Sequence, residues 1–143
     1  MRTESRARSR ALQAVYAWDV RGSGTGSGGN TSLDRVAQRV FDDLAVGPDE
    51  QKFAGFIVRT LLTRGEEIDA TLTEVTTNWR LSRLGAIDRS VLRLAAAELL
   101  MRTTPPRVVI KESVRLAERY GTAQSAKFVN GVLDAFARKH GLL

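Results

Sequence analysis

The chain has 143 residues, of which 43% are hydrophobic and 27% charged, a length and composition that suit one globular domain with its own core. It has no cysteine, which excludes disulfides, thiolate metal sites and cysteine nucleophiles, and its single histidine, His140, excludes metal sites with several histidines. We expect no histidine-based catalytic triad. The net charge of +6 favours a nucleic acid or an acidic surface as partner.

Neither a membrane helix nor a secretory signal is expected. The longest apolar stretches fall far short of a bilayer span, and no apolar segment follows the basic N-terminus. We therefore expect a cytoplasmic protein.

The first part of the chain predicts three helices. An alanine-rich helix runs from the N-terminal arginines to about Arg21 and is followed by a flexible Gly/Ser loop at 22–30. Ser32 can cap a second helix, which ends at Gly47-Pro48, and Asp49 can cap a third. Apolar residues at helical spacing support the second and third helices: Leu33, Val36, Ala37, Val40 and Phe41, then Phe53, Phe56, Ile57 and Leu61.

The remaining chain predicts four more helices. One follows Gly65, a second begins near Asp88, a third follows Pro105-Pro106 and ends at Gly121, and the last reaches the C-terminal region. The supporting apolar positions are Ile68, Leu72, Val75 and Trp79; Val91, Leu92, Ala95 and Leu99; Ile110, Val114 and Ala117; and Val129, Val132, Leu133 and Phe136. The sequence thus predicts an all-α fold of six to seven short helices in one or two bundles, forming a single domain over 1–143.

Arginines near the N-terminus are the first candidate binding residues. Residues 1–10 contain Arg2, Arg6, Arg8 and Arg10 and one glutamate, a local charge of +3. Such a segment can order on RNA, since phosphates attract guanidinium groups and unpaired bases stack on their planes. The alternative is a solvated helix start that keeps the protein soluble.

A second candidate lies around Lys127 and Phe128. An aromatic ring beside a cation can stack on a base, although such a phenylalanine more often widens the core face of its helix.

Two further charged regions have alternative interpretations. Asp88 can cap its helix, or together with Arg89 and Arg93 it can present polar groups to a protein partner. Residues 101–120 carry a local charge of +3, with Lys111, Arg115 and Arg119 one helical turn apart. Glu112 can compensate part of that charge by pairing on the helix surface.

Nothing in the sequence indicates catalysis. There is no phosphate loop, dinucleotide fingerprint or metal-ligand cluster, and the adjacent carboxylates Asp42-Asp43 and Glu66-Glu67 point apart on a helix. We expect no catalytic residue, no metal and no cofactor.

Three stretches resemble the NusB family, and in this order and spacing they span nearly the whole chain. The first is an arginine-rich start at 8–18, the second covers 88–99, and the third joins 109–121 to the octapeptide Lys127-Phe-Val-Asn-Gly-Val-Leu-Asp134. The loop at 22–30 has no such match. The resemblance implies an all-helical fold of two small bundles and a role in transcription antitermination rather than catalysis.

The resemblance also implies partners. NusB-like proteins pair with NusE, a ribosomal protein, bind the boxA element of nascent ribosomal RNA transcripts, and join RNA polymerase with other Nus factors. Some of them form homodimers.

Site residues follow by position in the matched stretches. The implied RNA-binding residues are Arg6, Arg8, Arg10, Tyr16, Tyr120, Gln124, Lys127 and Phe128. Asp88 matches an acidic position near the RNA and partner contacts, and together with Arg89 it is the expected partner-binding site. Relatives often have arginines in place of Glu4 and Ser5, which predicts weak RNA affinity without NusE. Some have an acidic residue in place of Gln124, which puts its role in doubt.

Two other functions are compatible with the sequence. A similar helical domain precedes the catalytic part of some ribosomal RNA methyltransferases, although these 143 residues leave no room for a methyl-donor-binding fold. A protein–protein adaptor with a charged surface is the other.

Overall fold

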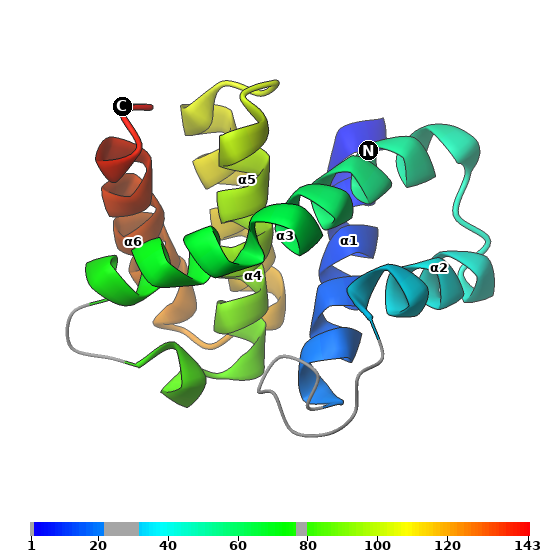
Figure 1. Cartoon of the computed structure of the whole chain (residues 1–143), viewed down its shortest axis with the longest axis horizontal. Helices are drawn as coiled ribbons and strands as arrows, with labels where there is room; N and C mark the ends of the chain where they lie inside the picture. The colour runs from blue at the N-terminus through cyan, green and yellow to red at the C-terminus, as the bar shows by residue number, and fades with distance from the viewer. Residues whose placement is uncertain (1, 22–31, 77–79) are drawn as a thin grey trace.

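The computed structural model describes residues 2–21, 32–76 and 80–143, and over these ranges it contains α-helices and one 3-10 turn but no strand (Figure 1). The elements are α1 (Thr3–Val20), α2 (Leu33–Asp43), α3 (Pro48–Val75), the 3-10 turn η2 (Leu81–Arg83), α4 (Ala86–Met101), α5 (Pro106–Tyr120) and α6 (Ser125–Lys139). The predicted all-α fold is confirmed. The Gly/Ser loop and Trp79 lie outside the described residues.

The helices form two bundles that share α3. In Figure 1, α1 and α2 pack with the first half of α3, while α4 and α6 pack with its second half and α5 packs on α4 and α6. Helix α4 contacts α1, α3, α5 and α6, and every residue from 90 to 100 is buried. A helix that is buried on all sides needs small and apolar residues all round, which the run Val91–Leu100 supplies apart from Arg93 and Glu98.

The two helices that the sequence predicts on either side of Gly65 correspond to two helical segments of α3. A kink at Arg64, whose φ of −116° and ψ of 17° are non-helical, divides these segments directly before Gly65. A glycine inside a helix costs about 1 kcal/mol, so a departure from helical geometry is favoured at this point. Ile68 and Leu72 in the second half are fully buried.

The start of α3 differs from the prediction. Helix α3 begins at Pro48 after Gly47, so Asp49 lies in the first turn rather than at the cap. Proline suits the first helical position because its missing N–H has no partner there in any case. The carboxylates of Asp49 and Glu50 in this turn complement the positive end of the helix dipole.

The turn at the end of α5 requires glycine at position 121, because there is no room for a side chain there. Its backbone is extended (φ −99°, ψ −158°) rather than left-handed. A Cβ atom would lie 2.5 Å from Ser125 Oγ and 2.8 Å from the Ala117 carbonyl oxygen. The Ser125 hydroxyl instead accepts a hydrogen bond from the Thr122 N–H at 2.9 Å, which sets the tight turn between α5 and α6.

No helix among the described residues combines the length and the apolar character needed to cross a bilayer.

Candidate nucleic-acid interface

Arg8 lies in the interior, whereas the resemblance implies that it belongs to an RNA-binding surface. Its Nε and Nη2 atoms donate hydrogen bonds to the two carboxylate oxygens of Glu98 at 2.7 and 2.6 Å. Its Nη1 lies 3.6 Å from Glu112 Oε1, and its guanidinium lies 5.3 Å from the centre of the Phe53 ring. With 5% of its surface exposed, Arg8 links α1 to α4 and α5 and has little area left for a phosphate.

The Arg8 guanidinium remains charged in this setting. Burial alone would lower the pKa of Arg8, but the hydrogen bond and the charge of Glu98, together with the charges of Glu112 and Glu4, raise it above its ordinary value. Each buried charge is therefore paired.

The other two predicted arginines differ from each other in exposure. Arg6 is exposed and pairs across the surface with Glu50, with Nε 2.6 Å from Oε1. Arg10 is half-buried, and its Nη1 donates a 3.3 Å hydrogen bond to Gln13. Arg6 therefore remains open to an RNA backbone, whereas Arg10 offers only part of its guanidinium.

The remaining predicted RNA residues lie on the surface. Tyr16 is 38% exposed and Tyr120 is 42% exposed, which is more than is usual for large aromatic side chains. Gln124 and Lys127 are also exposed. Phe128 is half-buried and packs against the core, which supports the alternative that it widens the core face of α6.

Helices α1 and α5 run in the same direction, so the end of α1 and the turn after α5 lie toward the same end of the molecule. Ser5 near the start of α1 donates a 2.7 Å hydrogen bond to Glu112 in α5, and one turn further along, Ser9 lines the same groove as Arg119. Seven more residues of α1 add about 10 Å, which brings Tyr16 level with the turn that carries Gln124. In Figure 1 the C-terminal end of α1 and the α5–α6 turn both lie at the lower end of the molecule.

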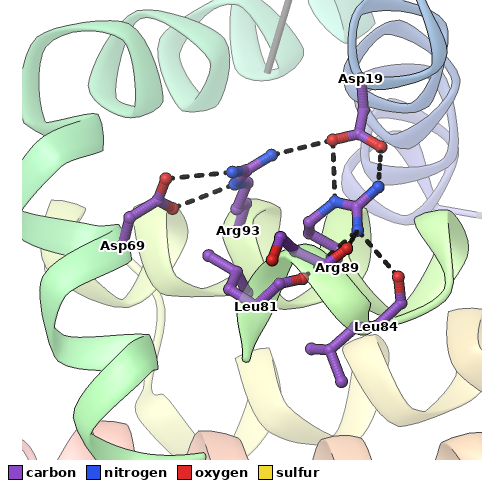
Figure 2. Close-up of polar contacts among 7 residues, drawn as sticks. Asp19, Asp69, Leu81, Leu84, Arg89 and Arg93 are labelled. Carbon is purple, nitrogen blue, oxygen red and sulfur yellow. Dashed lines mark hydrogen bonds and ion pairs between the residues drawn. The ribbon is translucent and has the colours of Figure 1, made fainter. Parts of the chain in front are cut away.

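Asp88 and Arg89 do not have equal access to a partner. Asp88 is half-buried in the first turn of α4, and the N-cap is Gly85, so the predicted capping role is wrong. Arg89 is held internally: its Nε and Nη2 donate to Asp19 at 2.9 and 2.5 Å, and its Nη1 donates to the Leu84 carbonyl at 2.8 Å (Figure 2). Arg89 therefore has internal partners, whereas the sequence predicts that it contacts another protein.

A chain of ion pairs extends from Arg89 across the molecule. Figure 2 shows Asp19 of α1 between Arg89 and Arg93 of α4, and Arg93 reaching on to Asp69 of α3. Arg93 lies 3.0 Å from Asp19 and forms two 3.0 Å hydrogen bonds with Asp69. The hydrogen bond with Asp19 raises the pKa of Arg89 against the opposing effect of burial. The network fixes three helices relative to one another.

The sequence carried a signal for both networks that the predicted sites did not use. Glu98 stands in an otherwise small and apolar stretch, and Asp19 continues the apolar stripe of α1. A carboxylate at a core position must find a cationic partner, so each was a sign of a buried ion pair. Which arginine supplies the partner depends on tertiary packing.

No cluster of three or more potential metal ligands occurs among residues 2–21, 32–76 and 80–143.

Comparison with known proteins places this arrangement in a family. Residues 5–138 match the model of the NusB family. The transcription antitermination protein NusB of Anaeromyxobacter dehalogenans is 41% identical over 136 residues, covering 93% of this chain and 89% of that protein. NusB of Sorangium cellulosum is 37% identical over 142 residues, covering 99% and 96%.

Solved structures agree with this assignment. NusB of T. maritima superimposes with a TM-score of 0.84 at 31% identity, covering 95% of this chain and 91% of that one. A chain from a complex of the antitermination factors NusB and NusE with double-stranded RNA gives 0.83 at 30% identity, covering 97% and 98%. By its sequence, its fold and its matched length, the chain belongs to the NusB family.

Proposed function

We propose that this protein is a transcription antitermination factor that binds boxA-type RNA in nascent ribosomal transcripts together with the ribosomal protein NusE. It works in the cytoplasm without catalysis, metal or cofactor, and the RNA-bound pair joins RNA polymerase with other Nus factors. Membership of the NusB family carries this proposal, since the relatives are antitermination proteins and one solved relative is complexed with NusE and RNA.

The RNA surface that we propose lies where α1 ends and α5 turns into α6. Tyr16 and Tyr120 offer exposed rings for base stacking, Gln124 offers an amide for hydrogen bonds to base edges, and Lys127 offers a charge for phosphate. Arg6 extends this surface toward the N-terminus, with Arg10 in support. Arg8 acts indirectly, by anchoring the N-terminal part of α1 to Glu98.

The protein partner is proposed to contact the start of α4 through Asp88, which is half-buried and not part of the Asp19 network. Arg89 serves this surface from beneath, because its Nη1 binds the carbonyls of Leu81 and Leu84 and so holds η2 against α4. A homodimer that covers part of either surface would compete with RNA or NusE.

A gel-shift titration tests the proposal. The protein, with and without NusE, is titrated onto boxA RNA and onto a scrambled RNA of equal length at two salt concentrations. We expect a preference for boxA that NusE strengthens and that persists at the higher salt, because base contacts are less salt-sensitive than phosphate contacts. Equal binding of both RNAs would mean charge attraction alone.

A duplex form of the same RNA belongs in that titration. The solved relative holds double-stranded RNA, whereas we propose recognition of unpaired bases by Tyr16 and Tyr120. Bases in a duplex are stacked on one another and cannot stack on these rings, so the single strand should bind more tightly.

The alternative of a pure protein–protein adaptor predicts that NusE binds while no RNA does, with or without NusE.

A further inference from the structure

The outer side of α5 carries a row of cations that the proposed RNA surface does not use. Arg107, Lys111, Arg115 and Arg119 follow one another at intervals of four residues, and all four are exposed. We name these four residues the α5 ridge. Arg115 is 64% exposed and pairs with Glu112 at 3.0 Å, a surface contact that weakly restrains its charge.

The ridge crosses the molecule obliquely. A step of four residues advances about 6 Å along a helix and turns about 40° around it, so the row covers roughly 18 Å and winds by about 120°. The surroundings agree with this winding. Arg107 and Lys111 line a groove against α6, while Arg119 lines a groove against the N-terminal half of α1, where Arg2 adds another cation.

Acidic groups along the ridge cancel only part of its charge. Glu112 receives hydrogen bonds from Ser5 and Arg115 and lies near the buried Arg8, so it is directed toward α1. Glu118 and Asp134 line the groove on the α6 side, and Asp134 pairs with Arg138. The four ridge cations are thus exposed, and two of the three nearby carboxylates, those of Glu112 and Asp134, already have hydrogen-bond or ion-pair partners.

We propose that the α5 ridge binds the phosphate backbone of the RNA that flanks the recognised element, without reading its sequence. This rests on the proposed function, because the ridge ends at Arg119, next to Tyr120 and close to Gln124. The guanidinium of Arg119 lies 5.3 Å from the centre of the Tyr120 ring, which joins the last cation to the first stacking residue. A strand leaving that surface meets a cation at each turn of α5.

An RNA strand fits the ridge better than a membrane surface does. A helix that lies on a bilayer must present an exposed apolar face beneath its cations. The apolar side of α5, with Val109, Ile110 and Leu116, is buried in the protein core. A narrow row of charges on a helix packed in this way suits a linear polyanion.

Fluorescence anisotropy with two RNAs tests the ridge. One RNA spans only the boxA element, and the other carries an unstructured tail of unrelated sequence, added in turn at each end. For the unaltered protein we expect the tail at one end to raise the affinity and to steepen the dependence of the binding constant on salt. The double variant Lys111→Gln/Arg119→Gln should lose both effects, with the logarithmic salt slope flattened by up to about 1.4, or about 0.7 per lost phosphate contact on a single strand.

A matched variant controls for overall charge. Arg35→Gln/Arg39→Gln also removes two positive charges, but from exposed positions on α2 in the other bundle. This variant should leave the tail effect intact. All four positions are exposed, and circular dichroism verifies that both variants fold.

Several outcomes would overturn the ridge. These are a tail effect that survives in Lys111→Gln/Arg119→Gln, an equal loss in both double variants, or equal weakening of the short and tailed RNAs. The proposal would also be contradicted if Lys111→Gln/Arg119→Gln lost binding to anionic lipid vesicles while its affinity for both RNAs stayed unchanged. A failure of the proposed function looks different, since boxA and scrambled RNAs would then bind equally while the tail effect could still be measured on either.

Discussion

The guanidinium of Arg8 lies between α1, α4 and α5, and its removal would leave the Glu98 carboxylate buried without a cation. Breaking one side of a buried ion pair typically costs about 3–5 kcal/mol. We expect Arg8→Ala to lower the free energy of unfolding by that amount, as measured by urea denaturation followed by circular dichroism. The slope of RNA affinity against salt should change little while the variant stays folded.

Arg6→Ala is the control for this effect, because the Arg6 side chain is 48% exposed and its pair with the partly buried Glu50 should contribute about 1 kcal/mol, well below the buried Arg8 pair. The apolar replacement Arg8→Met/Glu98→Leu should recover much of the stability, since it leaves no unpaired partner in that pair. If Arg8→Ala left stability intact and flattened the salt slope, Arg8 would be a phosphate contact after all.

Arg102 is a strained residue at the end of α4. Its φ of 58° and ψ of 24° are left-handed, a conformation that costs a residue with a side chain about 1 kcal/mol or more. We expect Arg102→Gly to raise the melting temperature and the free energy of unfolding by up to about 1 kcal/mol. Arg102→Ala keeps the Cβ atom and should bring no such gain, so equal stabilisation by both would assign the effect to the lost charge.

Among the elements, α1, α3 and α4 are held together by the Asp19 network. The Asp19 side chain is 1% exposed and serves both Arg89 and Arg93, whereas that of Asp69 is 40% exposed and serves Arg93 alone. We expect Asp19→Ala to cost about 3 kcal/mol of unfolding free energy. Asp69→Ala should cost about 1 kcal/mol or less, because water screens its carboxylate. Thermal denaturation of the two variants side by side measures the difference, and equal losses would contradict the network as described.

Two kinds of RNA contact are proposed at the helix ends that form the RNA surface: base stacking on Tyr16 and phosphate binding by Lys127. Tyr16→Ala should weaken boxA binding by about 1–3 kcal/mol through lost stacking, with the salt slope unchanged. Lys127→Gln should flatten that slope by about 0.7 instead. Titrations over a range of salt distinguish them, and a slope that changes in Tyr16→Ala would mean that its loss displaces phosphate contacts.

Helical periodicity in the sequence was enough to predict most elements. The apolar stripes predicted the bounds of α1, α2, α5 and α6 to within a few residues, because each of these helices buries one face, and apolar residues recur on that face at helical spacing. The division of α3 next to Gly65 was predicted, but its form as a kink at Arg64 without an intervening loop was not, since it depends on how both segments pack on the core. That packing is tertiary information.

The candidate RNA-binding residues came mostly from the resemblance to the NusB family. That resemblance implied Tyr16, Tyr120, Gln124 and Lys127, and all four side chains are exposed in the structure. Residue type and spacing alone indicated only the arginines near the N-terminus and the pair Lys127 and Phe128. The sequence does not show which arginines are buried. Arg8 looks like its neighbours along the chain, and only the approach of Glu98, ninety residues away, distinguishes it.

At the scale of the whole molecule, we propose that two bundles joined by α3 present one RNA-binding end and one partner-binding surface. Buried ion pairs fix α1 relative to α4, and the contacts of Arg8 and Ser5 with Glu112 add α5, so the proposed stacking groups and the α5 ridge depend on them. A rigid arrangement of this kind lowers the entropic cost of ordering an RNA strand.

The ratio of dissociation constants for scrambled and boxA RNA, measured by competition with NusE present at near-physiological salt, tests this account most directly. Specific recognition predicts that the scrambled RNA dissociates far more readily, and that the ratio falls when Tyr16 is replaced by alanine. A ratio of one, obtained with folded protein that still binds NusE, would contradict the account.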